Sequence, residues 1–282
     1  SYDEGQTIKQ PELAESLKLL SQNGYRDFYE GELATKIVEG LRNAGSLIRL
    51  NDLQQTRCRI EKPIELPYRD GYLLAHQPPT QGLTTLEIMG ILRNFDFAKI
   101  SEGSALYYHL IVEAVKLAFL DRNALIGDPD FSDVPTSVVL GGDNLSALAG
   151  KINIDRARPW PDVFKMADTV FLAATDKTGL SVSMLQTIYY DWGSGVSVGD
   201  TGILWHNRGA AFSLELGHPN YIQSRKRPFH TLNPGIFMKN ERPNLLYGTQ
   251  GADGQPQTLA TLLTRMIDYE LDPKTALSRP RF

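Results

Sequence analysis

Apolar side chains recur at helical spacing over most of the first 125 residues. Apolar residues three or four positions apart predict helices over 11–24, 33–43 and 84–95. Proline and glycine predict short extended pieces over 60–72 and a loop over 76–82. The longest helix is predicted over about 104–123, with a buried stripe of Leu110, Ile111, Ala114, Val115, Leu117 and Ala118.

The pattern becomes strand-like after residue 168. Apolar or alternating segments predict strands over 170–174, 180–189, 203–205, 235–238 and 245–247. A closing helix is predicted over 257–271, with Leu259, Leu262, Leu263 and Met266 on its inner face. Helices followed by strands and a final helix favour the α+β fold class.

Composition excludes several classes of protein. The chain has 282 residues, of which 41% are hydrophobic, and a formal net charge of −4, so it can bury a core and is a poor nucleic-acid or anionic-membrane binder. No apolar run approaches the roughly 18 residues of a membrane span. The single Cys58 permits neither an internal disulfide nor a cysteine-based zinc site. The first residues lack a signal-peptide pattern, and we expect a cytoplasmic protein.

Neither a metal nor a cofactor is predicted. None of the five histidines lies four residues from another, as a helical metal-binding pair requires. The glycine-rich runs 193–199 and 248–254 lack dinucleotide-loop spacing and a phosphate-loop lysine, respectively. The second run lies between a predicted strand and a predicted helix, where backbone N–H groups can bind an anion. A plain turn is the alternative.

Two further patterns have ordinary structural explanations. Residues 195–199 match Gly-x-Ser-x-Gly, but a nucleophile elbow needs a helix after Ser197, and a strand is predicted there instead. Asp128, Asp130 and Asp133 can act as an acid–base group or simply form a turn beside proline and glycine.

The Asp168–Thr169 junction is the strongest candidate for chemistry. If the bond before Thr169 were cut, this one residue would hold a hydroxyl nucleophile and an α-amine with a pKa of about 7.7–8.0, suited to act as a base. In an uncut chain, Thr169 is simply a good β-former at the start of a buried strand.

Several motifs, in order along the chain, resemble the γ-glutamyltranspeptidase family. They are Gln10–Ala14, Phe28–Gly31, Ala118–Arg122, Gly127–Phe131, Gly193–Gly195, Thr201–Leu204, Lys226–Pro228 and Pro280–Arg281. The resemblance implies an N-terminal-nucleophile hydrolase with an αββα sandwich, incomplete here at the N-terminal half of the large subunit. Residues 1–168 would be the mostly helical C-terminal part of the large subunit, and 169–282 the strand-rich small subunit that pairs with it. Such a part would leave sheet edges and core faces uncovered.

The resemblance also implies roles for individual residues. Asp168 and Thr169 would form the self-cleavage site, and Thr169 would be the nucleophile. Thr187 would orient the nucleophile by a hydrogen bond. Gly251 and Ala252 would supply backbone donors to the oxyanion, and no cofactor would be needed.

The substrate positions depart from those expected for γ-glutamyl groups. They are Tyr189, Arg208, Ala211, His230 and Thr231. Arg208 without an acid at Ala211 favours an acyl group that carries an anion and no amine. Alternatively, Arg208 is a surface salt-bridge former and His230 a satisfied, partly buried histidine.

Three stretches point to one branch of the family. Asn207–Ser213, His230–Pro234 and Gly251–Gln257 are similar to the oxamate amidohydrolase-like branch. We therefore expect a small carboxylate-bearing amide as substrate. The alternatives are hydrolysis or transfer of γ-glutamyl groups from peptides such as glutathione, and an inactive, unprocessed homologue that serves as a binding module.

Overall fold

The computed structural model describes residues 3–160 and 168–281. The chain divides into two compact units. The first comprises Ser1–Ile60 with Tyr190–Asn207, and the second comprises Glu61–Tyr189 with Arg208–Phe282. Each unit therefore takes residues from both sides of the 168/169 boundary. The predicted subunit boundary concerns where the chain is cut, and it stays a prediction.

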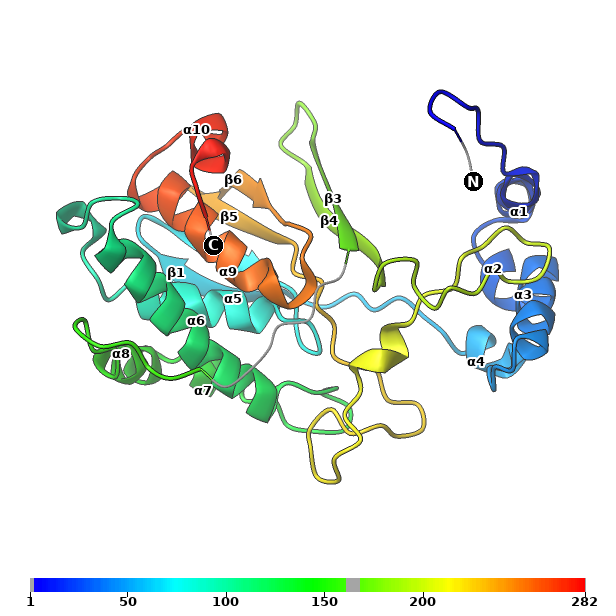
Figure 1. Cartoon of the computed structure of the whole chain (residues 1–282), viewed down its shortest axis with the longest axis horizontal. Helices are drawn as coiled ribbons and strands as arrows, with labels where there is room; N and C mark the ends of the chain where they lie inside the picture. The colour runs from blue at the N-terminus through cyan, green and yellow to red at the C-terminus, as the bar shows by residue number, and fades with distance from the viewer. Residues whose placement is uncertain (1–2, 161–167, 282) are drawn as a thin grey trace. The chain divides into compact units, whose positions relative to one another are not determined.

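Helices dominate the first unit. They are α1 (Pro11–Asn23), α2 (Asp27–Glu30), α3 (Glu32–Asn43) and α4 (Leu50–Gln54) (Figure 1). The apolar face of α3 forms a small core with Leu53 and Val198. The carboxylate of Asp27 accepts hydrogen bonds from the backbone N–H groups of Glu32 and Leu33, at 3.1 and 3.0 Å, and so caps α3. The helices predicted over 11–24 and 33–43 are confirmed.

The glycine-rich run 193–199 belongs to this first unit. The N–H of Val198 donates to the carbonyl of Ile203 at 2.9 Å, and Ser197 pairs with Leu204 in an isolated bridge. Because no helix follows Ser197, the nucleophile-elbow match is a chance one, as predicted. The strand predicted over 203–205 is wrong, since this bridge pairs one residue only.

The second unit is built on an antiparallel sheet. Its strands are β1 (Ile64–Tyr68), β2 (Gly71–Ala75), β5 (Gly235–Lys239) and β6 (Arg242–Tyr247), in the order β1-β2-β5-β6. Ile64, Leu66 and Tyr68 of β1 are buried, whereas the alternate residues Glu65 and Pro67 are exposed. Strand alternation thus gives β1 one face toward the core.

Helices cover the buried face of this sheet. The helix α5 (Gly82–Leu92) is buried along its whole length, contacts β1 and β2, and packs against α6 (Ala105–Leu125) and α9 (Gln255–Leu263) (Figure 1). All six residues of the predicted α6 stripe are buried. The shorter helices are η1 (Phe97–Lys99), α7 (Thr136–Val139), α8 (Gly142–Gly150) and α10 (Pro273–Ser278). The predicted α+β class is confirmed.

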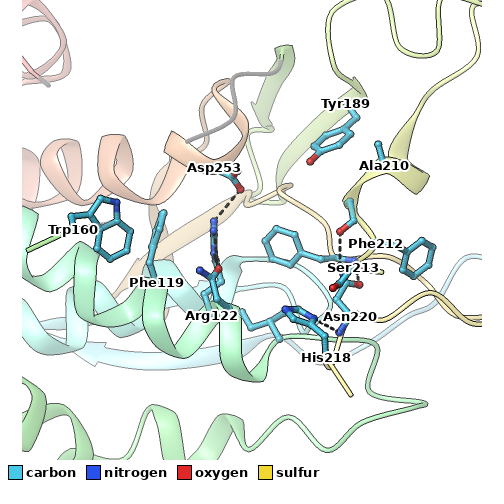
Figure 2. A pocket seen from close by; sticks show the side chains of 14 residues that line it. Phe119, Arg122, Trp160, Tyr189, Ala210, Phe212, Ser213, His218, Asn220 and Asp253 are labelled. Carbon is cyan, nitrogen blue, oxygen red and sulfur yellow. Dashed lines mark hydrogen bonds and ion pairs between the residues drawn. The ribbon is translucent and has the colours of Figure 1, made fainter. Parts of the chain in front are cut away.

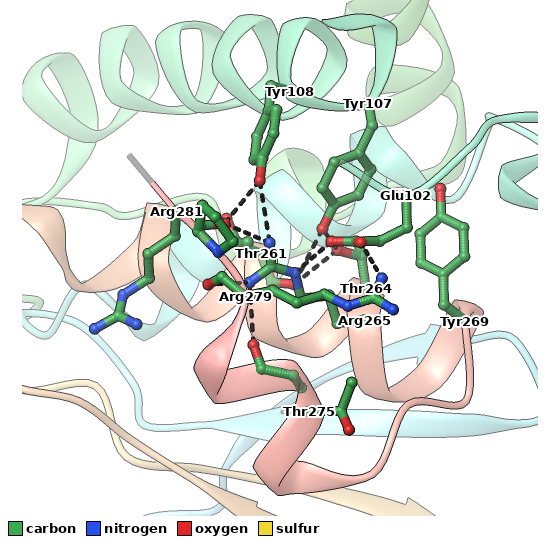
Figure 3. Close-up of polar contacts among 12 residues, drawn as sticks. Glu102, Tyr107, Tyr108, Thr261, Thr264, Arg265, Tyr269, Thr275, Arg279 and Arg281 are labelled. Carbon is green, nitrogen blue, oxygen red and sulfur yellow. Dashed lines mark hydrogen bonds and ion pairs between the residues drawn. The ribbon is translucent and has the colours of Figure 1, made fainter. Parts of the chain in front are cut away.

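The closing helix differs from its prediction. It continues as a π-helical turn, η4 (Thr264–Asp268), and ends there rather than at residue 271. Leu259 and Leu263 are buried, but Leu262 and Met266 are half-buried, so the predicted inner face is partly wrong. Arg265 is fully buried because Glu102 pairs with it at 2.7 Å and the carbonyls of Ala276 and Pro280 accept its N–H groups (Figure 3).

A separate hairpin begins at Asp168. Its strands are β3 (Asp168–Thr175) and β4 (Ser181–Tyr189), and Ser183 Oγ donates to the carbonyl of Tyr247 in β6 at 3.3 Å. One face of the hairpin exposes large apolar side chains: Val170, Leu172, Val182 and Met184 are 43–58% exposed. The expectation that a core face is left uncovered stays a prediction.

Two functional predictions can be compared with the described residues. No helix in the described part of the chain is long and apolar enough to cross a membrane. Across residues 3–160 and 168–281, no three His, Cys, Asp or Glu side chains cluster in a way that could hold a metal ion.

Candidate active site

The β3–β4 hairpin brings Thr169 and Thr187 onto neighbouring strands. Asp168 pairs with Tyr189 and Val170 with Gln186, so the single residue Thr169 lies opposite two residues, Thr187 and Ile188. Such a β-bulge redirects side chains locally. Thr169 is only 5% exposed, and its burial agrees with either of its two predicted roles.

The end of β4 is held in an uncommon conformation. The hydroxyl of Thr187 accepts a hydrogen bond from the N–H of Tyr189 at 2.9 Å. Tyr189 has a φ of +82°, which a non-glycine residue adopts at a cost of about 1–3 kcal/mol. This conformation lets the Tyr189 ring stack on Arg208, whose guanidinium carbon lies 3.8 Å from the ring centroid.

Arg208 is a buried residue of the short helix η2 (Arg208–Ala211). It is 5% exposed, and both terminal nitrogens of its guanidinium lie 3.3 Å from the hydroxyl of Thr231, which accepts from them. The alternative of a surface salt bridge is therefore wrong. Burial keeps water away from the guanidinium, and this strengthens any hydrogen bond that it makes to an anion.

Backbone hydrogen bonds fix the segment His230–Thr231. The N–H of His230 donates to the carbonyl of Pro79 at 2.8 Å, and its carbonyl accepts from the N–H of Gln81 at 2.9 Å. His230 is half-buried and Thr231 is 1% exposed. The side chain of Gln81 then reaches the carbonyls of both Thr231 and Ala252, each at 2.7 Å.

Gly251 and Ala252 lie in the loop between β6 and α9, as predicted. Gly251 has a φ of +114°, in the region that favours glycine, and Ala252 has a φ of +44° and is 1% exposed. The short helix η3 (Ala252–Gly254) leads directly into α9. The backbone N–H groups at this turn lie at the start of a helix, where the dipole favours a negative charge.

A continuous series of contacts joins most of the predicted residues. It runs from Thr187 through Tyr189, Arg208 and Thr231 to Gln81 and Ala252. Thr169 and Asp168 adjoin its first members by strand register. His230 joins through its backbone bonds. The predicted residues thus gather in one region of the second unit.

A cavity of about 300 Å³ opens beside this series (Figure 2). Tyr189 and Ala211 line it, together with the aromatic side chains of Phe119, Trp160, Phe212 and Phe229. Sequence reasoning gave no role to its charged pair, Arg122 and Asp253, although both residues lie in stretches that carry the family resemblance.

Arg122 and Asp253 form an ion pair in this cavity. The N···O distance is 3.0 Å, and the side chains are 12% and 16% exposed. The Arg122 guanidinium also lies over the rings of Phe119 and Phe229, at 4.1 and 5.5 Å. The cavity therefore has an acid that Ala211 does not supply, and Arg122 neutralises it.

Asp128 has a structural role rather than an acid–base one. It is fully buried, and its carboxylate accepts bonds from Arg227, at 2.8 Å from the backbone N–H and 2.6 Å from the guanidinium, and from the N–H of Asp130. Burial alone would raise the pKa of Asp128, but these hydrogen bonds and the Arg227 charge hold that pKa below its ordinary value. The turn interpretation is confirmed for Asp128.

Comparison with known proteins agrees with this architecture. A family model described as Gamma-glutamyltranspeptidase matches residues 1–282. The chain is 44% identical over 279 residues to the glutathione hydrolase-like YwrD proenzyme of Bacillus subtilis, covering 99% of this chain and 53% of that protein. It is 42% identical over 278 residues to the oxamate amidohydrolase proenzyme of Klebsiella pneumoniae, covering 99% and 52%.

A solved structure is similar along nearly the whole chain. The cephalosporin acylase from Bacillus halodurans superposes with a TM-score of 0.88 at 31% identity, over 98% of this chain and 51% of that one. The chain thus spans about half the length of the curated relatives it matches.

Proposed function

Because the chain belongs to the γ-glutamyltranspeptidase family, we propose that it is part of a self-processing amidohydrolase whose nucleophile is Thr169. The observation that carries the proposal is the position of Thr169 at the start of β3. It is buried there and lies across a bulge from Thr187, at one end of the contact series that reaches Ala252.

Self-cleavage would start from the Thr169 hydroxyl. Its oxygen attacks the carbonyl carbon of Asp168, the peptide C–N bond breaks, and the Asp168 acyl group moves to the oxygen as an ester. The former peptide nitrogen gains a proton and becomes an α-amine. Water then hydrolyses the ester, which leaves Asp168 as a carboxylate and frees the hydroxyl.

Turnover would use the same two groups of Thr169. The α-amine accepts the hydroxyl proton while the oxygen attacks the substrate amide, and the leaving nitrogen departs protonated as ammonia or an amine. Backbone N–H groups at Gly251–Ala252 would stabilise the oxyanion, and each such donor can lower the barrier by about 3–4 kcal/mol. Water, or an acceptor amine, resolves the acyl-enzyme.

We favour a small amide that carries a carboxylate, as in oxamate. The buried guanidinium of Arg208 supports this choice, as does the similarity to an oxamate amidohydrolase. One observation favours the alternative of a γ-glutamyl donor. Asp253 lines the same cavity as Ala211, and its carboxylate, which is paired with Arg122, would face an α-ammonium group by sharing that ion pair. The cytoplasmic location stays a prediction.

Self-cleavage is tested in the full-length protein by intact mass and a denaturing gel. The wild type should yield a chain that begins at Thr169, and Thr169→Ala should stay in one piece. Thr175→Ala, at the exposed far end of the same strand, is the matched control and should be cut normally. Uncut wild type at neutral pH would instead support the inactive binding module.

The substrate is tested by comparing two donors on the processed enzyme. Ammonia release from oxamate is measured against chromophore release from a γ-glutamyl anilide. We expect the faster turnover with oxamate. Turnover of the anilide alone would contradict the preference and support the γ-glutamyl alternative.

A further inference from the structure

Gln81 lies where two predicted parts of the site meet. It precedes α5, is fully buried, and sits in a segment whose sequence indicated only a loop. Its side-chain Nε2 donates to the carbonyl of Thr231 and to the carbonyl of Ala252, each at 2.7 Å. One amide group thus links two loops that are 21 residues apart in sequence, and its own backbone N–H also bonds to the first of them, at His230.

The chemistry of the amide fixes which way it points. Two carbonyl oxygens are acceptors only, so the NH₂ end must face them and a flipped amide would set three oxygens together. The other end, Oε1, is buried with no hydrogen-bond partner within the described part of the chain. An unpaired buried acceptor costs about 1–3 kcal/mol, which the two donated bonds must offset. An aliphatic side chain would avoid that cost but would join nothing.

The two linked loops differ in their expected tasks. On one side, Thr231 also accepts from Arg208, so this loop belongs to the proposed substrate-binding residues. On the other side, the carbonyl of Ala252 lies one peptide plane after the Ala252 N–H, a proposed oxyanion donor. Both Gly251 and Ala252 have a positive φ in this turn. Holding that carbonyl restrains a backbone that would otherwise relax from an uncommon conformation.

We propose that Gln81 is a positioning residue that sets the separation and orientation of the substrate-binding loop and the oxyanion loop. This inference rests on the proposed function. Gln81 itself touches neither the nucleophile nor the reacting atoms in this scheme. It acts through the backbone of Ala252, so its loss should impair transition-state stabilisation more than ground-state binding.

The kinetic test uses Gln81→Leu in the full-length, processed enzyme. Rates are divided by the number of active sites titrated by an acylation burst, so that misfolded protein does not count. We expect kcat to fall at least 30-fold with KM changed less than threefold. The proposal is overturned if kcat stays within threefold of the wild type, or if only KM changes. Gln81→Met, which has similar length and no donor, repeats the test if the leucine variant does not fold.

Gln255→Leu is the matched control. Gln255 is also fully buried, lies in the first turn of α9, and makes no side-chain hydrogen bond within the described residues. Its replacement should leave kcat within threefold. An equal fall in both variants would mean that any change to a buried glutamine disturbs the core, and it would overturn the specific role of Gln81.

Hydrogen exchange separates this inference from the proposed function. Loss of the Gln81 donors should speed amide exchange at least tenfold in segments 230–233 and 251–254, and Gln255→Leu should not have this effect in segment 230–233. If the wild type hydrolyses neither oxamate nor the γ-glutamyl anilide while amide exchange responds as expected, the proposed function fails and the link between the loops stands. Unchanged exchange in Gln81→Leu overturns the link whatever the activity.

Discussion

A carboxyl pair between α5 and α6, formed by buried Glu87 and half-buried Asp121, gives a prediction that depends on pH. Glu87 is 1% exposed and shares a hydrogen bond with Asp121. The pKa of Glu87 is raised from 4.5 to about 10, mainly by burial and secondly by the neighbouring Asp121. The group therefore stays neutral in the folded protein at neutral pH. The perturbation that tests this is Glu87→Gln, which keeps the shape and removes the titration.

The sign of the effect follows from proton linkage. In the unfolded chain Glu87 loses its proton near pH 4.5, whereas the folded protein retains it up to about pH 10. Between these values the folded state binds more protons, so the free energy of unfolding falls as pH rises, by about 1.4 kcal/mol per pH unit. The free energy of unfolding of Glu87→Gln should exceed that of the wild type by about 1 kcal/mol at pH 5 and by about 3 kcal/mol at pH 7.

Urea unfolding of the full-length protein at pH 5, 6, 7 and 8 measures this difference. The matched control is Glu113→Gln on α6. Glu113 is buried to the same degree, but Lys116 pairs with it at 2.6 Å and the N–H of Arg158 donates to it at 3.1 Å. Its neutralisation leaves Lys116 without a counter-charge and should destabilise by about 3 kcal/mol. A Glu87→Gln gain that does not vary with pH would refute the reasoning.

Two packing predictions concern stability, and thermal unfolding measures both. Arg265→Met removes a buried guanidinium from the carbonyl oxygens that it binds (Figure 3), and should lower the free energy of unfolding by about 3 kcal/mol or more. The control Arg281→Met, at an exposed position, should change it by less than about 0.5 kcal/mol. Equal effects would contradict the role of burial. In the first unit, Gly40→Ala would put a Cβ 2.7 Å from the Gly199 nitrogen and should cost about 1–3 kcal/mol. The control Gly150→Ala places its Cβ in open space and should cost little stability. A harmless Gly40→Ala would show that α3 does not pack closely against the Val198–Gly199 backbone.

Local sequence determined the elements because their signals lie within one or two turns of chain. The apolar stripe at 110–118 and the period-two pattern at 180–189 each specify a conformation without help from distant residues, and the glycines at 248–254 predict a turn between a strand and a helix. The motifs that carry the family resemblance are also read in order along the chain, and the family is confirmed over its whole length.

Only the tertiary structure decided how charged and amide side chains are used. Arg208 has no neighbour in sequence that predicts its stacking on Tyr189 or its bonds to Thr231. Asp253 and Ala211 line one cavity although 42 positions separate them in the sequence. Gln81 gains its link across loops from contacts 150 and 171 residues away. Hydrogen bonds and ion pairs depend on distances of about 3 Å between atoms, and a linear pattern of residue types does not encode such distances.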